Sequence, residues 1–163
     1  DLSLPPHLLG AAVLLEYRPY DPADTPAFHG TLRQTYEDTL DCPELNGARP
    51  VEDVVAGHRA AGRFDPGRWL LAAADGEPVG VLLLADTPET GDWEVSYVGV
   101  VPASRRRGVG RELMLRALAE ARAAGATGLT LAVDARNRPA RNLYRALGFE
   151  PYDAREVFLA VWK

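Results

Sequence analysis

Residues 98–111 read Val98-Gly99-Val100-Val101-Pro102-Ala103-Ser104-Arg105-Arg106-Arg107-Gly108-Val109-Gly110-Arg111. The segment begins as a Val-rich strand, passes through a proline, and turns among arginines and glycines into a helix. Glycine lets the backbone approach a ligand closely, and the first turn of a helix offers free N–H groups at the positive end of its dipole. This pattern therefore predicts an anion site suited to a pyrophosphate, with arginines adding charge-assisted hydrogen bonds.

Other interpretations of this turn compete with a pyrophosphate site. A dinucleotide-binding fingerprint needs a third glycine where Leu113 stands, and it needs a βαβ unit around it. A nucleoside-triphosphate loop needs a Gly-Lys-Ser/Thr sequence, which the turn lacks. A solvated turn with a chance cluster of arginines stays open as the plain structural alternative.

Working outward from the turn, hydrophobic periodicity and turn signals predict one α/β (α+β) domain. Asp75-Gly76, between two apolar runs, is typical of a tight hairpin. The predicted strands are 13–20, 69–74, 78–85, 93–101, 127–134 and one or two within 150–163, and the predicted helices are 26–40, 51–61, 108–124 and 139–147. This order predicts a twisted mixed sheet of six or seven strands with helices on both faces, over residues 13–163. Residues 1–12, apolar and Pro-rich, are predicted to be an N-terminal arm or linker.

Composition narrows the class of partner. The 163 residues are 47% hydrophobic, with no apolar run long enough to span a bilayer, so no membrane partner is expected. The net charge of −5 is uneven: residues 1–92 carry −10 and residues 93–163 carry +5, which favours an anionic ligand on the second half. Basic residues gathered at one turn, without interleaved aromatic residues, do not suit a nucleic acid.

Cysteine and histidine usage predicts no disulfide and no metal. The single Cys42 rules out an internal disulfide and favours a cytoplasmic protein, and the three histidines lack metal-ligand spacing. Because the chain begins at Asp1 rather than at a methionine, we also expect more polypeptide upstream, such as a second domain of similar fold, and a homodimer stays open.

Two motifs carry a family resemblance. Arg105-x-x-Gly108-x-Gly110 resembles the Gln/Arg-x-x-Gly-x-Gly/Ala signature of the GNAT superfamily of N-acetyltransferases. Residues 137–149, Asn137-Arg138-Pro139-Ala140-Arg141-Asn142-Leu143-Tyr144-Arg145-Ala146-Leu147-Gly148-Phe149, resemble the family's Asn-x-x-Ala-x-x-Leu-Tyr-x-x-x-Gly-Phe helix. The resemblance is close over residues 67–150, whereas about the first 60 residues match only in the order of their elements.

The resemblance implies a GNAT fold and its activity. Strands 93–101 and 127–134 would be parallel neighbours that splay apart at their C-terminal ends, and Gly99 in mid-strand suits a bulge or a close backbone approach. Acetyl-CoA would be the co-substrate. Its acetyl group would pass directly to an amine of a small molecule or peptide, in a ternary complex.

The same resemblance assigns the cofactor contacts residue by residue. The backbone of Val98 and Val100 would pair with the pantetheine arm, and an N–H near Val100 would polarise the thioester carbonyl. Amides from Arg105 to Arg111 would hold the pyrophosphate, Asn137 would contact pantetheine, and Arg145 would reach a nucleotide phosphate. The cofactor-binding residues expected are Val98, Gly99, Val100, Arg105, Arg106, Arg107, Gly108, Val109, Gly110, Arg111, Asn137 and Arg145.

Two residues are expected to be catalytic. By resemblance, Tyr144 would protonate the departing thiolate, and Glu94, eleven positions before Arg105, would accept the proton of the amine. Strand alternation predicts residues 94, 96, 98 and 100 on one sheet face. The alternatives are core packing for Tyr144 and a solvent-facing or merely ion-pairing glutamate for Glu94. For the whole chain, the alternatives are a degenerate domain that binds acyl-CoA without catalysis and a pure scaffold.

Overall fold

The computed structural model describes residues 13–158 except 24, 46, 48 and 61–62. Within this part of the chain one sheet holds five strands in the order β1-β2-β3-β4-β5, with β4 and β5 parallel and every other neighbouring pair antiparallel. The strands are β1 (Glu16–Pro19), β2 (Trp69–Ala74), β3 (Glu77–Thr87), β4 (Asp92–Val100) and β5 (Leu129–Leu131). The α-helices are α1 (Thr25–Thr35), α2 (Val51–Ala60), α3 (Val109–Ala123) and α4 (Arg138–Ala146), and short 3-10 turns lie at Pro43–Leu45, Pro66–Arg68 and Pro102–Ser104. The predicted mixed sheet with helices is confirmed.

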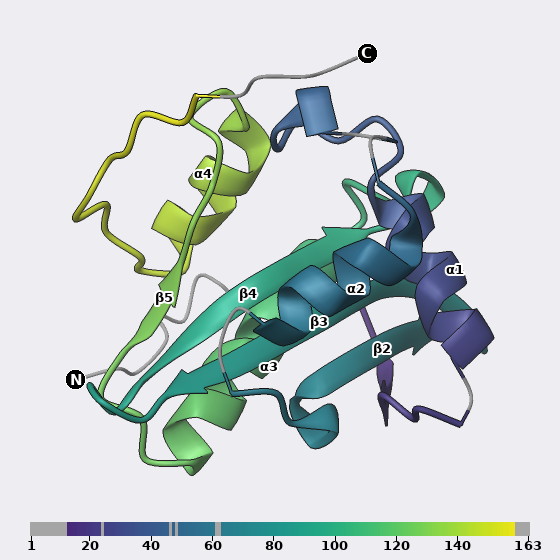
Figure 1. Cartoon of the computed structure of the whole chain (residues 1–163), viewed down its shortest axis with the longest axis horizontal. Helices are drawn as coiled ribbons and strands as arrows, with labels where there is room; N and C mark the ends of the chain where they lie inside the picture. The colour runs from purple at the N-terminus through teal and green to yellow at the C-terminus, as the bar shows by residue number, and fades with distance from the viewer. Residues whose placement is uncertain (1–12, 24, 46, 48, 61–62, 159–163) are drawn as a thin grey trace.

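The helices cover both faces of the sheet (Figure 1). On one face α1 and α2 bury an aromatic core around Trp69, Phe28 and Leu83. On the other face α3 packs with its apolar side against the sheet, and Val109, Leu113, Ala117 and Ala121 are buried there. Two cores on opposite sides of β4 result, and β4 supplies residues to both.

Local chemistry explains the sharpest turns. Asp75 and Gly76 adopt φ of +51° and +80° between β2 and β3, which confirms the predicted hairpin. Asn137 caps α4, because its side-chain oxygen accepts from the Ala140 amide at 3.2 Å.

Strand β4 separates from β5 near its middle. The two strands pair only over Trp93–Val95 and Leu129–Leu131, whereas β4 continues to Val100 along β3. The parallel, splayed pair is thus confirmed, and Figure 1 shows the chain after β5 leading away from β4 toward α4.

The irregularity in β4 falls at Ser96 rather than at Gly99. Leu83 pairs with Tyr97 and Leu84 with Val95, so Ser96 is the extra residue of a β-bulge. Gly99 instead provides the predicted close approach, because a Cβ there would lie 2.6 Å from the Cβ and Oγ1 of Thr35 in α1.

The bulge corrects the predicted alternation. Trp93 and Val95 pack into the α3-side core, and so do Val98 and Val100. Because one extra residue inverts the alternation, Glu94 does not share a face with Val98 and Val100. It lies on the α1/α2 face instead.

The predicted count of six or seven strands is too high for the described residues. Residues 150–158 form no strand, and Tyr152, Val157 and Phe158 are 81%, 85% and 90% exposed. A strand needs a hydrogen-bonded neighbour, which this segment lacks within the described chain. The remainder of that prediction, residues 159–163, and the predicted arm of residues 1–12 lie outside the described residues.

Candidate active site

The opening between β4 and β5 places a strand edge beside the cofactor-type turn. Beyond Val95 the edge of β4 that faced β5 has no strand beside it in the described part of the chain. Unpaired main-chain groups along such an edge can bind an extended ligand as an added strand. The predicted contacts of Val98, Gly99 and Val100 all lie on this stretch of β4.

The turn that follows β4 leaves several of its amides without a main-chain acceptor in the described chain. Gly108 is the N-cap of α3 with φ of +87°, and Arg106 has φ of +59°. No main-chain carbonyl of the described chain accepts from the amides of Arg106, Arg107 or Gly108. The next three amides, of residues 109–111, belong to the first turn of the helix and have no intrahelical acceptor. A run of donors at the positive end of a fifteen-residue helix can bind an anion.

The side chain of Arg105 hydrogen-bonds to main-chain oxygens of the protein. Its guanidinium donates four hydrogen bonds, which join the turn to the C-terminal end of α1. The acceptors are the main-chain oxygens of Val100 at 3.1 Å, Asp38 at 3.1 Å, Thr35 at 3.1 Å and Glu37 at 2.5 Å. Its main-chain N–H donates to Pro102 at 3.3 Å. The arginine that opens the motif therefore fixes the turn in place.

The other arginines of the motif region are placed differently. Arg106, Arg107 and Arg145 are exposed, and the structure gives them no ion-pair partner within the described residues. Arg111 pairs with the neighbouring Glu112 at 3.0 Å. The exposed guanidinium groups beside the free amides suit a phosphorylated ligand.

Tyr144 lies on α4 and turns inward, with only 9% of its surface exposed. Its ring packs edge-on against Phe149, with centroids 6.0 Å apart. Burial, with smaller contributions from the charge of Asp41 and from Tyr97, raises the pKa of Tyr144 to about 12. The phenol is therefore a protonated donor at neutral pH, as a general acid requires.

Glu94 is half-buried on β4, opposite Ala85 of β3 and Thr130 of β5. It is thus at the point where the two parallel strands still pair, just before they separate. The structure records no ion pair or side-chain hydrogen bond for it within the described residues. Its carboxylate keeps its full acceptor capacity.

A hydrogen-bonded aromatic group lines the same face of β4 as Glu94. Tyr97 stacks on Tyr36 with ring centroids 5.0 Å apart, and its hydroxyl lies 2.8 Å from Thr35 Oγ1. The Tyr36 hydroxyl lies 3.0 Å from His58 Nε2, and burial lowers the pKa of His58. These residues come from α1, α2 and β4, so they form a polar wall on the α1/α2 side of the opening.

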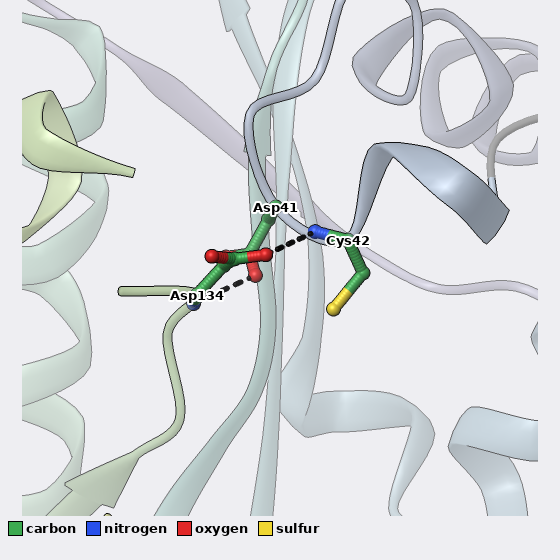
Figure 2. A group of neighbouring side chains, drawn as sticks. All are labelled: Asp41, Cys42 and Asp134. Carbon is green, nitrogen blue, oxygen red and sulfur yellow. Dashed lines mark hydrogen bonds between the residues drawn. The ribbon is translucent and has the colours of Figure 1, made fainter. Parts of the chain in front are cut away.

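A polar clasp joins the loop after α1 to the loop after β5 (Figure 2). Asp41 accepts from the Asp134 amide at 3.0 Å, and Asp134 accepts from the Cys42 amide at 3.2 Å. Arg136 then bridges Asp134 and Glu44, binding the latter bidentately at 2.6 and 3.0 Å. We call Asp41, Cys42, Glu44, Asp134 and Arg136 the loop clasp. It ties the loop after α1 to the loop that leads from β5 to α4.

Three members of the loop clasp have possible metal ligands within 4.8 Å of one another: Asp41, Cys42 and Asp134. Their chemistry suits the clasp better than a cation. Arg136 holds the pKa of Asp134 well below its usual range and uses its oxygens, whereas burial and neighbouring carboxylates raise the pKa of the Cys42 thiol. A protonated thiol is a poor ligand, and both carboxylates already accept backbone hydrogen bonds.

The structure places the predicted residues of β4 and of the following turn next to α4, the helix that Asn137 caps and that carries Tyr144, since Gly110 lies beside both Leu143 and Val100. It also shows contacts that sequence patterns do not reveal, around the loop after α1 and the α1/α2 face of β4. Asp41, Tyr36, His58 and Tyr97 were not expected there. Each depends on a partner more than twenty residues away, and no periodic pattern marks such pairs.

Comparison with known proteins identifies the family to which this chain belongs. The model of the Acetyltransferase (GNAT) family matches residues 32–149, which is most of the chain, so the chain belongs to that family. Acetyltransferases of this family use acetyl-CoA as co-substrate.

The relatives most similar in sequence among those described below share one name, mycothiol acetyltransferase. A mycothiol acetyltransferase of Thermomonospora curvata is 40% identical over 112 residues, covering 69% of this chain and 37% of that protein. One of Thermobifida fusca is 39% identical over 106 residues, covering 61% of this chain and 29% of that protein. The chain spans about a third of the length of the curated relatives it matches.

A solved structure supports the fold. A GNAT family acetyltransferase from Brucella melitensis, in complex with acetyl-CoA, superposes with a TM-score of 0.60 at 24% identity, covering 86% of this chain and 85% of that chain. Among the described residues, no helix combines the length and apolar character that crossing a membrane requires.

Proposed function

We propose that this chain transfers an acetyl group from acetyl-CoA to a primary amine by direct attack in a ternary complex. One observation carries the proposal: the free edge of β4 leads directly into the amide-lined turn, and the buried Tyr144 lies beside the same opening. A single extended ligand with a thioester at one end and a pyrophosphate at the other would contact the β4 edge, the turn and Tyr144.

In this proposal the turn binds the pyrophosphate of coenzyme A. Amides of residues 106–111 donate to its oxygens, Arg106 and Arg107 add charge, and Arg145 lies on α4 toward the nucleotide. Arg105 supports the turn through α1 rather than contacting phosphate, because its guanidinium donors are already used.

The pantetheine arm would lie along the free edge of β4. Main-chain groups of Val98 and Val100 would pair with its amides as a neighbouring strand does, whereas those of Gly99 face Val81 of β3. The N–H near Val100 would donate to the thioester oxygen, where negative charge develops during acyl transfer. Asn137 would contact the arm from the other side of the opening.

Glu94 and Tyr144 would move the protons. An alkylammonium cannot attack, so Glu94, directly or through water, takes one proton and frees the nitrogen lone pair. The nitrogen then bonds to the thioester carbon, and the carbon–sulfur bond breaks as the thiolate takes the phenol proton of Tyr144. The second excess proton of the nitrogen then passes through water to the Tyr144 phenolate and restores the phenol, and Glu94 releases its proton to solvent. The products are an acetamide and free coenzyme A.

The acceptor we propose is a small amine that enters from the α1/α2 side. The name of the relatives makes the unacetylated precursor of mycothiol the first acceptor to test. The polar wall of Tyr36, His58 and Tyr97 supports a hydrophilic acceptor there, because it offers hydroxyl and imidazole groups to hydrogen-bonding ligands.

A two-stage assay tests the proposal. Calorimetry measures coenzyme A binding, and release of free thiol then measures transfer to that precursor and to a panel of small amines. We expect binding together with acceptor-dependent thiol release. Binding without release for any amine would indicate an acyl-CoA sensor, and absence of binding would refute the proposal entirely.

A further inference from the structure

The C-terminal end of α1 is held from outside the helix, by the side chain of Arg105. The last carbonyl groups of an α-helix have no donor within the helix, and the helix dipole favours a cation near them. Arg105 donates to the last residue of α1 and to two residues just beyond it. The acceptors are the main-chain oxygens of Thr35 at 3.1 Å, Glu37 at 2.5 Å and Asp38 at 3.1 Å. The guanidinium therefore fixes where α1 ends and how the chain leaves it.

Thr35 connects this capped helix end to β4. Its hydroxyl donates its only proton to the Leu32 oxygen at 2.6 Å, so Tyr97 must be the donor in the 2.8 Å bond between the two hydroxyl groups. Thr35 also packs directly on the backbone of β4, because a Cβ at Gly99 would lie 2.6 Å from its side chain. Only 3% of Thr35 is exposed. The position of the Tyr97 hydroxyl thus depends on the position of the end of α1.

Tyr36, the first residue after α1, extends the connection to α2. Its ring stacks on Tyr97 with centroids 5.0 Å apart, and its hydroxyl lies 3.0 Å from His58 Nε2. The His58 ring lies against Tyr97 as well, with centroids 5.2 Å apart. All three residues of the polar wall are therefore arranged around the helix end that Arg105 caps.

We propose that Arg105 is a positioning residue for the acceptor: by capping α1 it holds the polar wall in the arrangement that binds the amine. The inference rests on the proposed function, and it gives the arginine at the start of the coenzyme motif a role toward the other substrate. The shape of the guanidinium suits this role, because its Nε also donates to the Val100 oxygen at 3.1 Å. One planar group with five donors thus joins β4 to α1, which the single ammonium of a lysine cannot reproduce in full.

Steady-state kinetics separates the two substrates, with the KM of each measured while the other is saturating. The substrates are acetyl-CoA and the amine that gives the fastest thiol release in the assay above. Arg105→Ala should raise the KM of the amine about fivefold, because hydrogen bonds from a charged group are lost. The KM of acetyl-CoA should change by less than about twofold. A smaller fraction of folded protein would instead lower kcat and leave both KM values unchanged.

Other variants test how Arg105 acts. Arg105→Lys should restore part of the affinity for the amine, and it carries the same test if the alanine variant does not fold. Arg107→Ala, a matched control in the same turn, should raise the KM of acetyl-CoA and leave that of the amine unchanged. Thr35→Val removes the acceptor of the Tyr97 bond and should raise the KM of the amine. Combined with Arg105→Ala, it should add less than its separate effect, because both act through the end of α1.

The imidazole NMR signals of His58, assigned with His58→Gln, report on the polar wall without any substrate. These signals should shift in Arg105→Ala and stay in place in Arg107→Ala. Unchanged His58 signals in Arg105→Ala, an unchanged KM of the amine, or equal increases of both KM values would overturn the proposal. A wild-type protein that binds no coenzyme A would refute the proposed function itself, whereas the His58 signals would still test the role of Arg105.

Discussion

The two sides of β4 reach the same opening by different means. On the α3 side, the turn from β4 into α3 uses backbone geometry: a left-handed Gly108, free amides and a helix terminus. On the α1/α2 side, the wall and the loop clasp use side chains that hydrogen-bond to one another, such as Tyr36 with His58. A site made of main-chain amides suits a ligand that is the same in every reaction, such as a pyrophosphate. A site made of side chains can be substituted to suit a different acceptor while the fold stays the same.

Arg105 connects the two sides, since it leaves the turn and donates to the end of α1. The loop clasp adds a second connection, between the loop after α1 and the loop after β5, through Asp134 and Arg136. If the contrast is correct, substitutions in the turn between β4 and α3 should alter coenzyme binding, and substitutions on the α1/α2 side, such as at Glu94, should alter turnover or stability.

The largest effect is expected at Gly108. Its φ of +87° is costly for any side chain, most of all for a β-branched one, and a Cβ would lie 3.2 Å from Val13 Cγ2. Gly108→Val should therefore redirect the turn amides and weaken coenzyme A binding by about 100-fold or more, while the protein stays folded. Calorimetry and circular dichroism measure the two properties.

Gly110 supplies the matched control for that variant. An added Cβ there would meet Leu143 and Val100 at 3.6 and 3.7 Å, which is ordinary contact. Gly110→Ala should bind coenzyme A within about threefold of wild type. Equal affinities for Gly108→Val and the wild-type protein would show that backbone shape at this turn does not hold the coenzyme.

Glu94→Gln should have the next largest effect, on turnover rather than on coenzyme binding. The substitution keeps the shape and removes the base, so kcat should fall about 100-fold at pH 7. It should recover toward high pH, where the free amine already lacks its extra proton. The pH–rate profile is the measurement, and Glu89→Gln, an exposed carboxylate before β4, is the control. Profiles of Glu94→Gln and wild type that coincide would exclude Glu94 as the base.

Tyr144→Phe should lower kcat by about 10-fold with an unchanged affinity for acetyl-CoA. The effect is smaller because a thiol, with a pKa of about 8.5, departs without full protonation. Because the pKa of Tyr144 is about 12, its phenol stays protonated below that pH, and it should produce no loss of rate between about pH 6 and 9. Tyr152→Phe, at an 81% exposed position, is the control. An unchanged kcat in Tyr144→Phe would assign this residue to packing alone.

The sequence predicts the α3 side far better than the α1/α2 side. Gly108, Asn137 and the hairpin at Asp75-Gly76 have local causes, namely a positive φ, a cap and a tight turn, and local causes leave patterns at fixed spacing. The face of Glu94 was mispredicted because a one-residue bulge at Ser96 depends on pairing with β3, which the strand's own sequence does not record.

The loop clasp shows the same limit at longer range. Asp41 and Asp134 are 93 residues apart, and although residues 127–134 are predicted as a strand, β5 ends at Leu131, so Asp134 lies in the loop that follows. Arg105 was expected at the pyrophosphate because of its motif, yet the end of α1 offers it several carbonyl oxygens in a single place. Such preferences are decided by tertiary packing, so they emerge only when the helix and the turn are seen together.

The smallest effects are expected at two arginines of the turn, Arg105 and Arg107, where substitution should change stability in one case and coenzyme affinity in the other. Arg105→Ala removes a guanidinium that holds the carbonyl oxygens of Thr35 and Asp38, so it should cost about 2 kcal/mol of unfolding free energy. Its effect on coenzyme A affinity should be below about threefold, because the side chain does not face the ligand. Arg107→Ala, at an exposed position without an ion pair in the described chain, should do the reverse. It should weaken coenzyme A about fivefold and leave stability unchanged. Urea denaturation and calorimetry on both proteins give the comparison. If Arg105→Ala lost affinity at full stability, its guanidinium would belong to the coenzyme site, and α1 would not depend on the turn.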